Sequence, residues 1–236
     1  MQIIIHTDKK LRWLKFAMVF LMVIGIAMVI RRTLVLSHLL PTSNIPKAFS
    51  FDQGFSNHPL ITLLHIIPGA LFMILGPIQF MPWIRARYIQ FHRWSGRVFM
   101  MAAYIIGLTA LILTFVKQPI GGITEATGTV FYSILFITFL SLALKSVLRK
   151  QIRLHREWMI RTFSIGLAIS TVRLITALAF ALFKLPPQNF MGTAFWLGFT
   201  MHLIVAEVWI NYTRQLPAVP PETVEFSYTD KEIVEQ

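Results

Sequence analysis

The chain has 236 residues, 56% of them hydrophobic and 14% charged, with a mean hydropathy of +0.65, which is typical of integral membrane proteins and excludes an ordinary soluble domain. The absence of cysteine excludes disulfides, thiolate metal sites and cysteine nucleophiles. The net charge of +12 does not indicate a nucleic-acid partner, because the basic residues stand at the ends of apolar segments and form no separate basic domain.

The apolar residues fall into six runs, each long enough to cross a hydrocarbon layer about 30 Å thick as an α-helix. The first run, from Phe16 to Ile30, is expected to remain in the protein, because Arg31 and Arg32 follow it in place of a small-residue cleavage site. The sequence therefore predicts an all-α membrane bundle of six transmembrane helices. The expected spans are residues 11–30, 58–81, 92–116, 127–148, 157–183 and 191–212.

Two parts of the chain differ in composition from the rest. The second span contains Pro68 and Pro77, and proline within a helix removes a backbone hydrogen bond and bends it, which membrane helices tolerate when neighbours compensate. The last residues are polar, acidic and interrupted by proline, which predicts disorder. The chain thus divides into an N-terminal transmembrane helix with a connecting loop (1–57), a five-helix transmembrane core (58–214) and a disordered cytoplasmic tail (215–236).

Lysine and arginine near the spans predict the orientation, since cytoplasmic loops carry an excess of both. Most of them fall on the side of the predicted bundle that holds both termini. We therefore expect a protein of the bacterial inner (plasma) membrane with both termini in the cytoplasm. Arg31 and Arg32 are the one pair that contradicts this orientation. The few basic residues on the opposite side are Arg31, Arg32, Lys47, Lys117 and Lys184.

Ionisable residues inside the spans are functional candidates, because a charge is costly in the hydrocarbon layer. By helical rise, His65, Arg173 and His202 are expected to converge in the outer half of the bundle. The sharpest interpretation of the histidines is haem ligation. Together with His92 and His155 they place four imidazoles on four different helices, and imidazole is a common ligand of haem iron.

Two b-type haems would each need two histidines from facing helices. His65 with His202 forms the outer pair, and His92 with His155 forms the inner pair. Each pair also has a structural interpretation. His92 and His155 are flanked by arginine at helix starts, which is typical of residues at the membrane interface, and an interhelical hydrogen bond would satisfy His65 or His202.

Arginines lie at both predicted levels, Arg173 at the outer one and Arg97 and Arg161 at the inner one, where they can hold haem propionates. Glu207 lies at a depth where it can pair with Arg97 or Arg161. Arg173 requires a partner of its own, and Glu125 in the outer loop is the nearest acidic residue by topology. We expect Arg173 to be functional.

Four motifs resemble a known family: the stretch from His65 to Phe80, the sequence HRWSGR from His92 to Arg97, the sequence HREWMIRTF from His155 to Phe163, and Arg173. Their order is similar to that of the bacterial membrane proteins called domain of unknown function 2306, over about residues 58–212. The resemblance implies a membrane protein and names no activity. The numbers of helices and histidines are also similar to the cytochrome b561 and ferric-reductase group, which is an architectural analogy only.

The first functional hypothesis is a haem b protein that transfers electrons between a quinol and a membrane redox partner. His65 and His202 would be the iron ligands, and Arg173 would contact a propionate or the quinone. The alternatives are a transporter or binding protein for a small anion or a lipid head group held by Arg173, and a non-catalytic accessory subunit of a larger membrane complex.

Overall fold

The structure is a computed structural model that describes residues 2–37, 53–117 and 119–215, and every element in these residues is helical. Six helices are long and apolar enough to cross a membrane, which confirms the predicted fold. The predicted tail after residue 215 lies outside the described residues. The long helices are α1 (Gln2–Leu36), α3 (Pro59–Phe80), α5 (Ile89–Val116), α6 (Gly122–Leu148), α7 (Ile152–Phe183) and α8 (Pro187–Gln215), and the short ones are α2 (Gln53–Ser56) and α4 (Pro82–Arg87).

The helices end where the sequence interrupts a regular backbone. Gly122 opens α6 with a φ of +61°, a conformation that glycine adopts without strain. Lys184 ends α7 in the left-handed conformation, with a φ of 53°, and its N–H donates to the carbonyl of Phe180. Pro187 then stands at the first residue of α8, where a missing N–H costs nothing. The short helix α4 was not predicted from the sequence.

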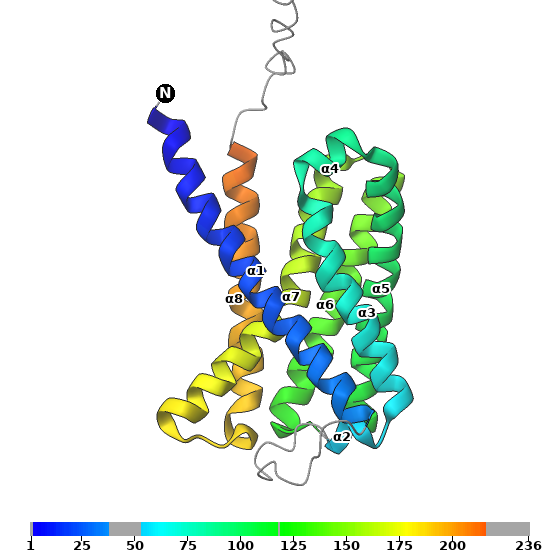
Figure 1. Cartoon of the computed structure of the whole chain (residues 1–236), viewed down its shortest axis with the longest axis vertical. Helices are drawn as coiled ribbons and strands as arrows, with labels where there is room; N and C mark the ends of the chain where they lie inside the picture. The colour runs from blue at the N-terminus through cyan, green and yellow to red at the C-terminus, as the bar shows by residue number, and fades with distance from the viewer. Residues whose placement is uncertain (1, 38–52, 118, 216–236) are drawn as a thin grey trace, which may run out of the picture.

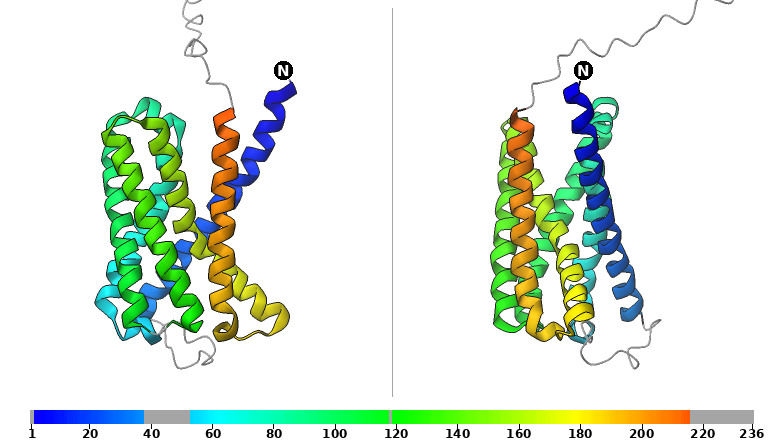
Figure 2. Two further views of the ribbon diagram at one scale, coloured as in Figure 1. Left: turned by 180° about the vertical axis from the view of Figure 1, so that it is seen from behind. Right: turned by 90° about the vertical axis from the view of Figure 1, so that its left-hand side faces the viewer.

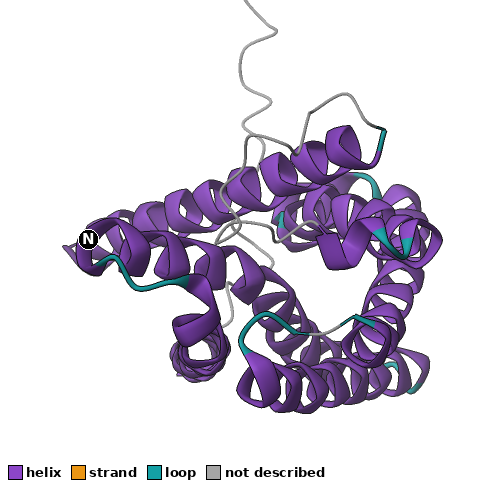
Figure 3. Cartoon of the chain, turned by 90° about the horizontal axis from the view of Figure 1, so that it is seen from below, coloured by secondary structure: helices purple, strands orange, loops and turns teal. Residues whose placement is uncertain are grey.

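The long helices form one bundle, with α1 laid diagonally across it (Figure 1). Helices α3, α5, α6 and α7 pack in sequence order, α8 packs on α7 and α6, and α1 contacts α3 and α7. The start of α1 and the end of α8 lie at the same end of the molecule, as an even number of spans requires (Figure 2). The view along the bundle shows helices joined by short loops in the described residues (Figure 3).

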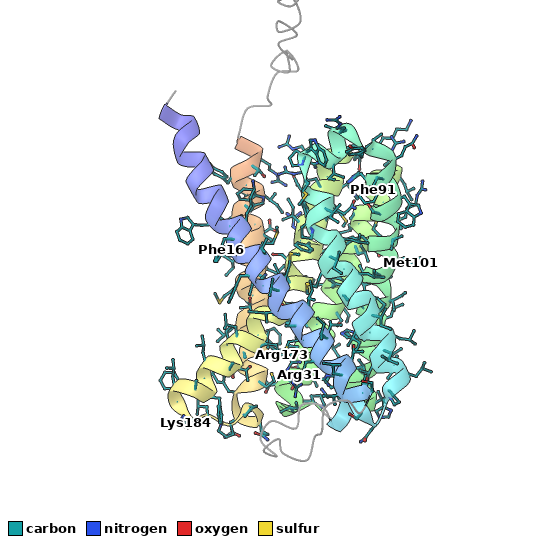
Figure 4. The ribbon with its side chains drawn as sticks, viewed as in Figure 1. Phe16, Arg31, Phe91, Met101, Arg173 and Lys184 are labelled. Atoms are coloured by element: carbon teal, nitrogen blue, oxygen red, sulfur yellow. The ribbon has the colours of Figure 1, made fainter. Side chains whose placement is uncertain are left out.

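Large apolar side chains face outward from the bundle. Phe16 of α1 and Met101 of α5 stand on opposite flanks, and both are mostly exposed (Figure 4). In a soluble protein such residues would indicate a docking surface or a risk of aggregation. Here they lie within helices that qualify as membrane spans, so the hydrocarbon layer is their expected surrounding.

Phenylalanines and glycines bring α3 and α7 together at the centre of the bundle. The Phe72 ring stacks on Phe99 with centroids 4.6 Å apart and lies 5.5 Å from the Phe163 ring. A Cβ atom at Gly76 of α3 would lie 2.1 Å from Phe163 of α7, and one at Gly166 of α7 would lie 2.4 Å from Phe72 of α3. Each helix therefore accepts a phenylalanine of the other against a glycine, the close packing that small residues permit in membranes.

Candidate functional site

A cavity of about 270 Å³ lies inside the bundle, with walls from all six long helices and from Phe55 of α2. One end of the cavity is apolar and reaches Phe72 and Phe136, which belong to the cluster of buried apolar side chains at the centre of the bundle. Its other end reaches Glu125 in the first turn of α6. Glu125 and Phe136 mark the two ends along α6, about 16 Å apart by helical rise. The cavity is therefore an elongated space that begins near α2 and ends near the middle of the bundle.

The charged residues of the cavity gather at the α2 end. Arg32 of α1, Lys117 at the end of α5 and Arg173 of α7 line it together with Glu125. Arg32 is 6% exposed and Glu125 is 7% exposed, so both are inside the protein. Figure 4 labels Arg173 and Arg31, the residue that precedes Arg32, and both lie in the half of the bundle that carries α2. Three helices and the residue that follows α5 thus contribute three cations and one carboxylate to one end of an otherwise apolar cavity.

Glu125 also stabilises the start of α6. Its Oε2 atom accepts a hydrogen bond of 2.7 Å from the N–H of Gly121, one of the backbone donors that a helix start leaves without an intrahelical partner. A carboxylate in the first turn is also favoured by the helix dipole. The position of this acidic side chain is therefore fixed by the helix that carries it.

Phe55 closes the α2 end of the cavity. The guanidinium of Arg32 and the ammonium of Lys117 each lie 3.9 Å from the centroid of its ring, at cation–π distance. The carbonyl of Phe55 accepts a 2.9 Å hydrogen bond from the hydroxyl of Thr62, a buried residue of α3. One aromatic side chain thereby connects α1, α2 and α5, and its backbone is anchored to α3.

His65 lines the cavity, and its hydrogen bonds determine the state of its ring. The Nδ1 atom lies 2.9 Å from the hydroxyl of Thr109 on α5. That hydroxyl donates its single hydrogen to backbone carbonyls of its own helix, the nearest being Ile105 at 2.6 Å. On this ground we assign Nδ1 of His65 as the donor to Thr109, and Nε2 is then the nitrogen available to a ligand.

Ser170 contributes a hydroxyl without a hydrogen-bond partner among the described residues. Its Oγ atom is buried, the residue is 2% exposed, and it lines the cavity one helical turn before Arg173. A Cβ atom at Gly25 of α1 would lie 3.0 Å from this oxygen, so α1 passes directly over it. Buried hydroxyls are normally satisfied, and an unsatisfied one at a cavity wall indicates a missing partner.

The expected convergence in this half of the bundle is observed for His65 and Arg173. His202 is held elsewhere: its Nε2 atom lies 2.8 Å from the hydroxyl of Thr171, and its carbonyl accepts from Ser164, both on α7. His202 is not among the residues described as lining the cavity. Both histidines thus have threonine partners on neighbouring helices, and haem ligation by them stays a prediction.

The predicted inner pair, His92 and His155, lies at the α4 end of the molecule. The Nδ1 atom of His155 donates to the carbonyl of Ala143 on α6 at 2.9 Å. The Nδ1 atom of His92 is buried and has no hydrogen-bond partner among the described residues. No group of three or more potential metal ligands occurs in the part of the chain that the structure describes. Haem ligation at this end also stays a prediction.

Two carboxylates toward the α4 end form ion pairs with arginines. Arg161 binds Glu207 with two hydrogen bonds, of 2.5 and 2.8 Å, whereas Arg97 is exposed. Of the two partners predicted for Glu207, the structure therefore selects Arg161. Arg214 of α8 likewise binds Glu157 of α7, a residue with 4% exposure. These ion pairs connect α7 to α8 over their cytoplasmic halves in the predicted orientation.

Arg85 of α4 lies near the charge of Arg156 on α7. Burial lowers the pKa of the Arg85 guanidinium from its ordinary value, and the nearby charge of Arg156 acts in the same direction. Both effects disfavour the charged form.

The cavity residues that were not identified as site residues from the sequence include Arg32, Phe55, Lys117 and Ser170. Arg32 did carry a signal, because Arg31 and Arg32 contradict the orientation that the other basic residues predict. The structure gives the reason for Arg32: its side chain is buried in the cavity and stacked on Phe55. A basic residue that breaks the charge rule is thus a candidate for a binding role.

Residues 62–210 match the family model described as "Predicted membrane protein (DUF2306)". No curated protein and no solved structure matches the chain. The matched part includes His65, Thr109, Glu125 and Arg173, whereas Arg32 precedes it. Since the match covers more than half of the chain, this protein belongs to the DUF2306 family of predicted membrane proteins.

Proposed function

We propose that this protein binds a single-chain amphiphile with an anionic head group inside the membrane, as a binding protein or a transporter. The observation that carries the proposal is the cavity, whose apolar walls lead to three cationic side chains at one end. This distribution matches a molecule with an apolar chain and a negative head. The ligand would lie with its head toward α2 and its chain toward the middle of the bundle.

The head end supplies the groups that bind oxyanions. Arg32 and Arg173 each carry a planar fork of N–H donors that matches carboxylate and phosphate oxygens, and Lys117 adds a compact positive charge. Attraction between charges is stronger in an interior of low dielectric than in water. Arg173 lies inside a membrane span. A charge there costs free energy, so such a residue is expected to have a function.

The chain end supplies shape. Gly69 of α3 lines the cavity, and a Cβ atom added there would meet no atom within 4 Å, so open space faces this helix. The volume of about 270 Å³ is slightly below the range of about 300–1,000 Å³ that is usual for ligand pockets. One alkyl chain suits this space better than the two chains of an ordinary bilayer lipid. Pro68 and Pro77 within α3 offer a bend at which the wall can move.

The proposal is tested by thermal unfolding of the protein in nanodiscs of a zwitterionic lipid, with and without lysophosphatidate. Binding to the folded state raises the unfolding temperature. We expect a rise for the wild type and none for Arg173→Gln, which removes one cavity charge. The matched control is Arg149→Gln, an exposed residue after α6, and it should respond like the wild type. An equal rise in all three proteins would contradict the proposal.

A haem b electron-transfer protein is the second candidate. His65 and Arg173 share one cavity, Nε2 of His65 is not engaged by Thr109, and the open space at Gly69 leaves room for a flat group. These residues fit one axial ligand and one propionate contact, and the haem would supply one-electron redox chemistry. A second axial ligand at this cavity, such as His202, would require a different side-chain arrangement. A quinol and a membrane redox partner belong to this candidate alone.

Both candidates share one topology. We propose the inner membrane with both termini in the cytoplasm, as the excess of basic residues at the α4 end supports. The cavity then lies in the outer half of the membrane. A ligand would reach it from the outer leaflet or from the outer aqueous side.

A further inference from the structure

We infer that the head group bound in the cavity is a weak acid that shares one proton with Nε2 of His65. The inference rests on the proposed amphiphile site and narrows its ligand class. The qualifying molecules are phosphomonoesters, which keep one ionised oxygen and one O–H at mildly acidic pH. A carboxylic acid does not qualify, because it loses its only charge when it takes up the proton. Phosphodiesters, sulfates and sulfonates are excluded, because they stay fully ionised under the same conditions.

The first step is the fixed role of Nδ1. Because the hydroxyl of Thr109 is placed to donate to the carbonyls of α5, we assign Nδ1 of His65 as the donor to this hydroxyl. In a neutral imidazole only one nitrogen carries hydrogen, so Nε2 then bears a lone pair. This atom accepts a hydrogen bond from an acid O–H, whereas a fully ionised oxygen would place a second lone pair against it.

The second step concerns the charged side chains that share the cavity with His65. The charged and titratable side chains that line the same cavity come from four other elements, and three of them are cations. The three cations favour an anionic head group. A head group that keeps one ionised oxygen and also carries one O–H therefore satisfies both the cations and Nε2. These side chains are Arg32 of α1, Lys117 after α5, Glu125 and Tyr132 of α6, and Arg173 of α7.

The third step is Ser170. Its buried hydroxyl has no hydrogen-bond partner among the described residues, and it stands one turn from Arg173 on the same helix. Since a hydroxyl can donate, it can satisfy a further oxygen of the acid. The site thus offers an acceptor at His65 and a donor at Ser170. No bond between heavy atoms forms or breaks, and the proton that the acid brings remains in its hydrogen bond to Nε2.

The test compares lysophosphatidate with its phosphate methyl ester, which has the same chain and glycerol and lacks only the titratable oxygen. Occupancy is measured by native mass spectrometry of the protein released from nanodiscs, between about pH 5 and about pH 8, which spans the second phosphate pKa of about 6. We expect the wild type to bind the monoester about tenfold more tightly than the ester at the acidic end. This preference should shrink as the pH rises, while binding of the ester stays constant.

His65→Gln keeps a hydrogen-bonding side chain that does not titrate, and it should remove the preference and its pH dependence. His202→Gln is the matched control, because it changes the other intramembrane histidine bound to a threonine, and it should keep both. If His65→Gln does not fold, Thr109→Val releases Nδ1 and should weaken the preference. A fatty acid of equal length is a further comparison, because its head group cannot carry a negative charge and an O–H at once. It should bind less tightly than the monoester at the acidic end, and equal binding of the two would contradict the inference.

Two further outcomes separate the inference from the proposed function. If the wild type binds the monoester and the methyl ester equally at every pH, and Arg173→Gln binds neither, the shared proton is wrong and the amphiphile site stands. If the wild type binds neither lipid nor the fatty acid, the proposed function itself is overturned.

Discussion

Gly76 of α3 and Phe163 of α7 are in such close contact that a methyl group on the glycine would lie 2.1 Å from the phenylalanine ring. Phe163 is also 5% exposed and sits 5.4 Å from Phe80 and 5.5 Å from Phe72, ring centroid to centroid. The ring has aromatic neighbours around it and little freedom to retreat. The glycine therefore fixes the distance between two helices that form walls of the cavity.

Gly76→Ala is expected to lower the free energy of unfolding by about 1–3 kcal/mol, the usual cost of overpacking a core. Gly69→Ala is the matched control on the same helix, because its methyl group would meet no atom within 4 Å. Alanine also favours a helix over glycine by up to about 1 kcal/mol, so the control should be at least as stable as the wild type. Reversible unfolding in mild detergent measures both. Equal stability of the two variants would contradict the packing described.

Filling the cavity from Gly69 should separate binding from stability. Gly69→Leu places an alkyl group in the open space, so we expect near-normal unfolding without ligand and loss of the lysophosphatidate-dependent rise in unfolding temperature. The measurement is the same thermal unfolding in nanodiscs. A variant that keeps the full rise would show that the lipid binds outside this cavity.

The pair Arg161–Glu207 should show a measurable interaction between α7 and α8. The Glu207 side chain is 47% exposed, so we expect a coupling of about 1 kcal/mol and not the larger value of a buried pair. A double-mutant cycle of Arg161→Gln and Glu207→Gln on the free energy of unfolding isolates it. The cycle of Arg97→Gln with Glu207→Gln serves as the comparison, and additive effects are expected there. A larger coupling for Arg97 would place Glu207 differently.

The proposed orientation predicts the side on which a reporter fused after Gln236 is found. A reporter that is active only in the cytoplasm should be active there, and one that is active only outside should be inactive. Arg32→Gln should leave this result unchanged, because Arg32 lies in the cavity and its charge is not what orients the chain. Removing basic residues at the α4 end should instead weaken the orientation. An active reporter on the outer face of the wild type would reverse the assignment of the two sides.

The haem candidate makes a spectroscopic prediction. The protein purified in detergent, after expression with a haem precursor, should show sharp bands of reduced b haem when dithionite is added. His65→Ala and His202→Ala should each remove bound haem, and full occupancy in both variants would exclude these ligands. A featureless spectrum of the wild type would leave the amphiphile site as the leading function.

The six spans could be predicted because the thickness of the hydrocarbon layer fixes the length of apolar sequence that crosses it. The helix boundaries were predicted less accurately than the spans. Helix α6 begins at Gly122 and not near residue 127, because its polar first turn lowers the local hydropathy. The helix α4 was not predicted because it has only six residues, from Pro82 to Arg87, and two of them are arginines. Hydropathy does not report such short helices.

Only some residues of the candidate site could be predicted from the sequence. His65 and Arg173 stood out because they are ionisable residues within spans, and the structure brings both to one cavity. Arg32 and Lys117 lie at helix ends, where basic residues are common, so nothing local separates them from interface anchors. Their joint contact with Phe55 depends on how α1, α2 and α5 meet, which is a property of the tertiary structure.

The distribution of the site over several helices has a consequence for biogenesis. Ribosomes deliver Arg32, Lys117 and Glu125 before α7, so the carboxylate of Glu125 is already in place when Arg173 arrives. The cavity is then completed only when α7 and α8 have both inserted, because α8 also forms part of its wall, and ion pairs join these two helices. Chains truncated before α7 would expose three unassembled ionic side chains within the bilayer, and membrane quality-control proteases would be expected to degrade them.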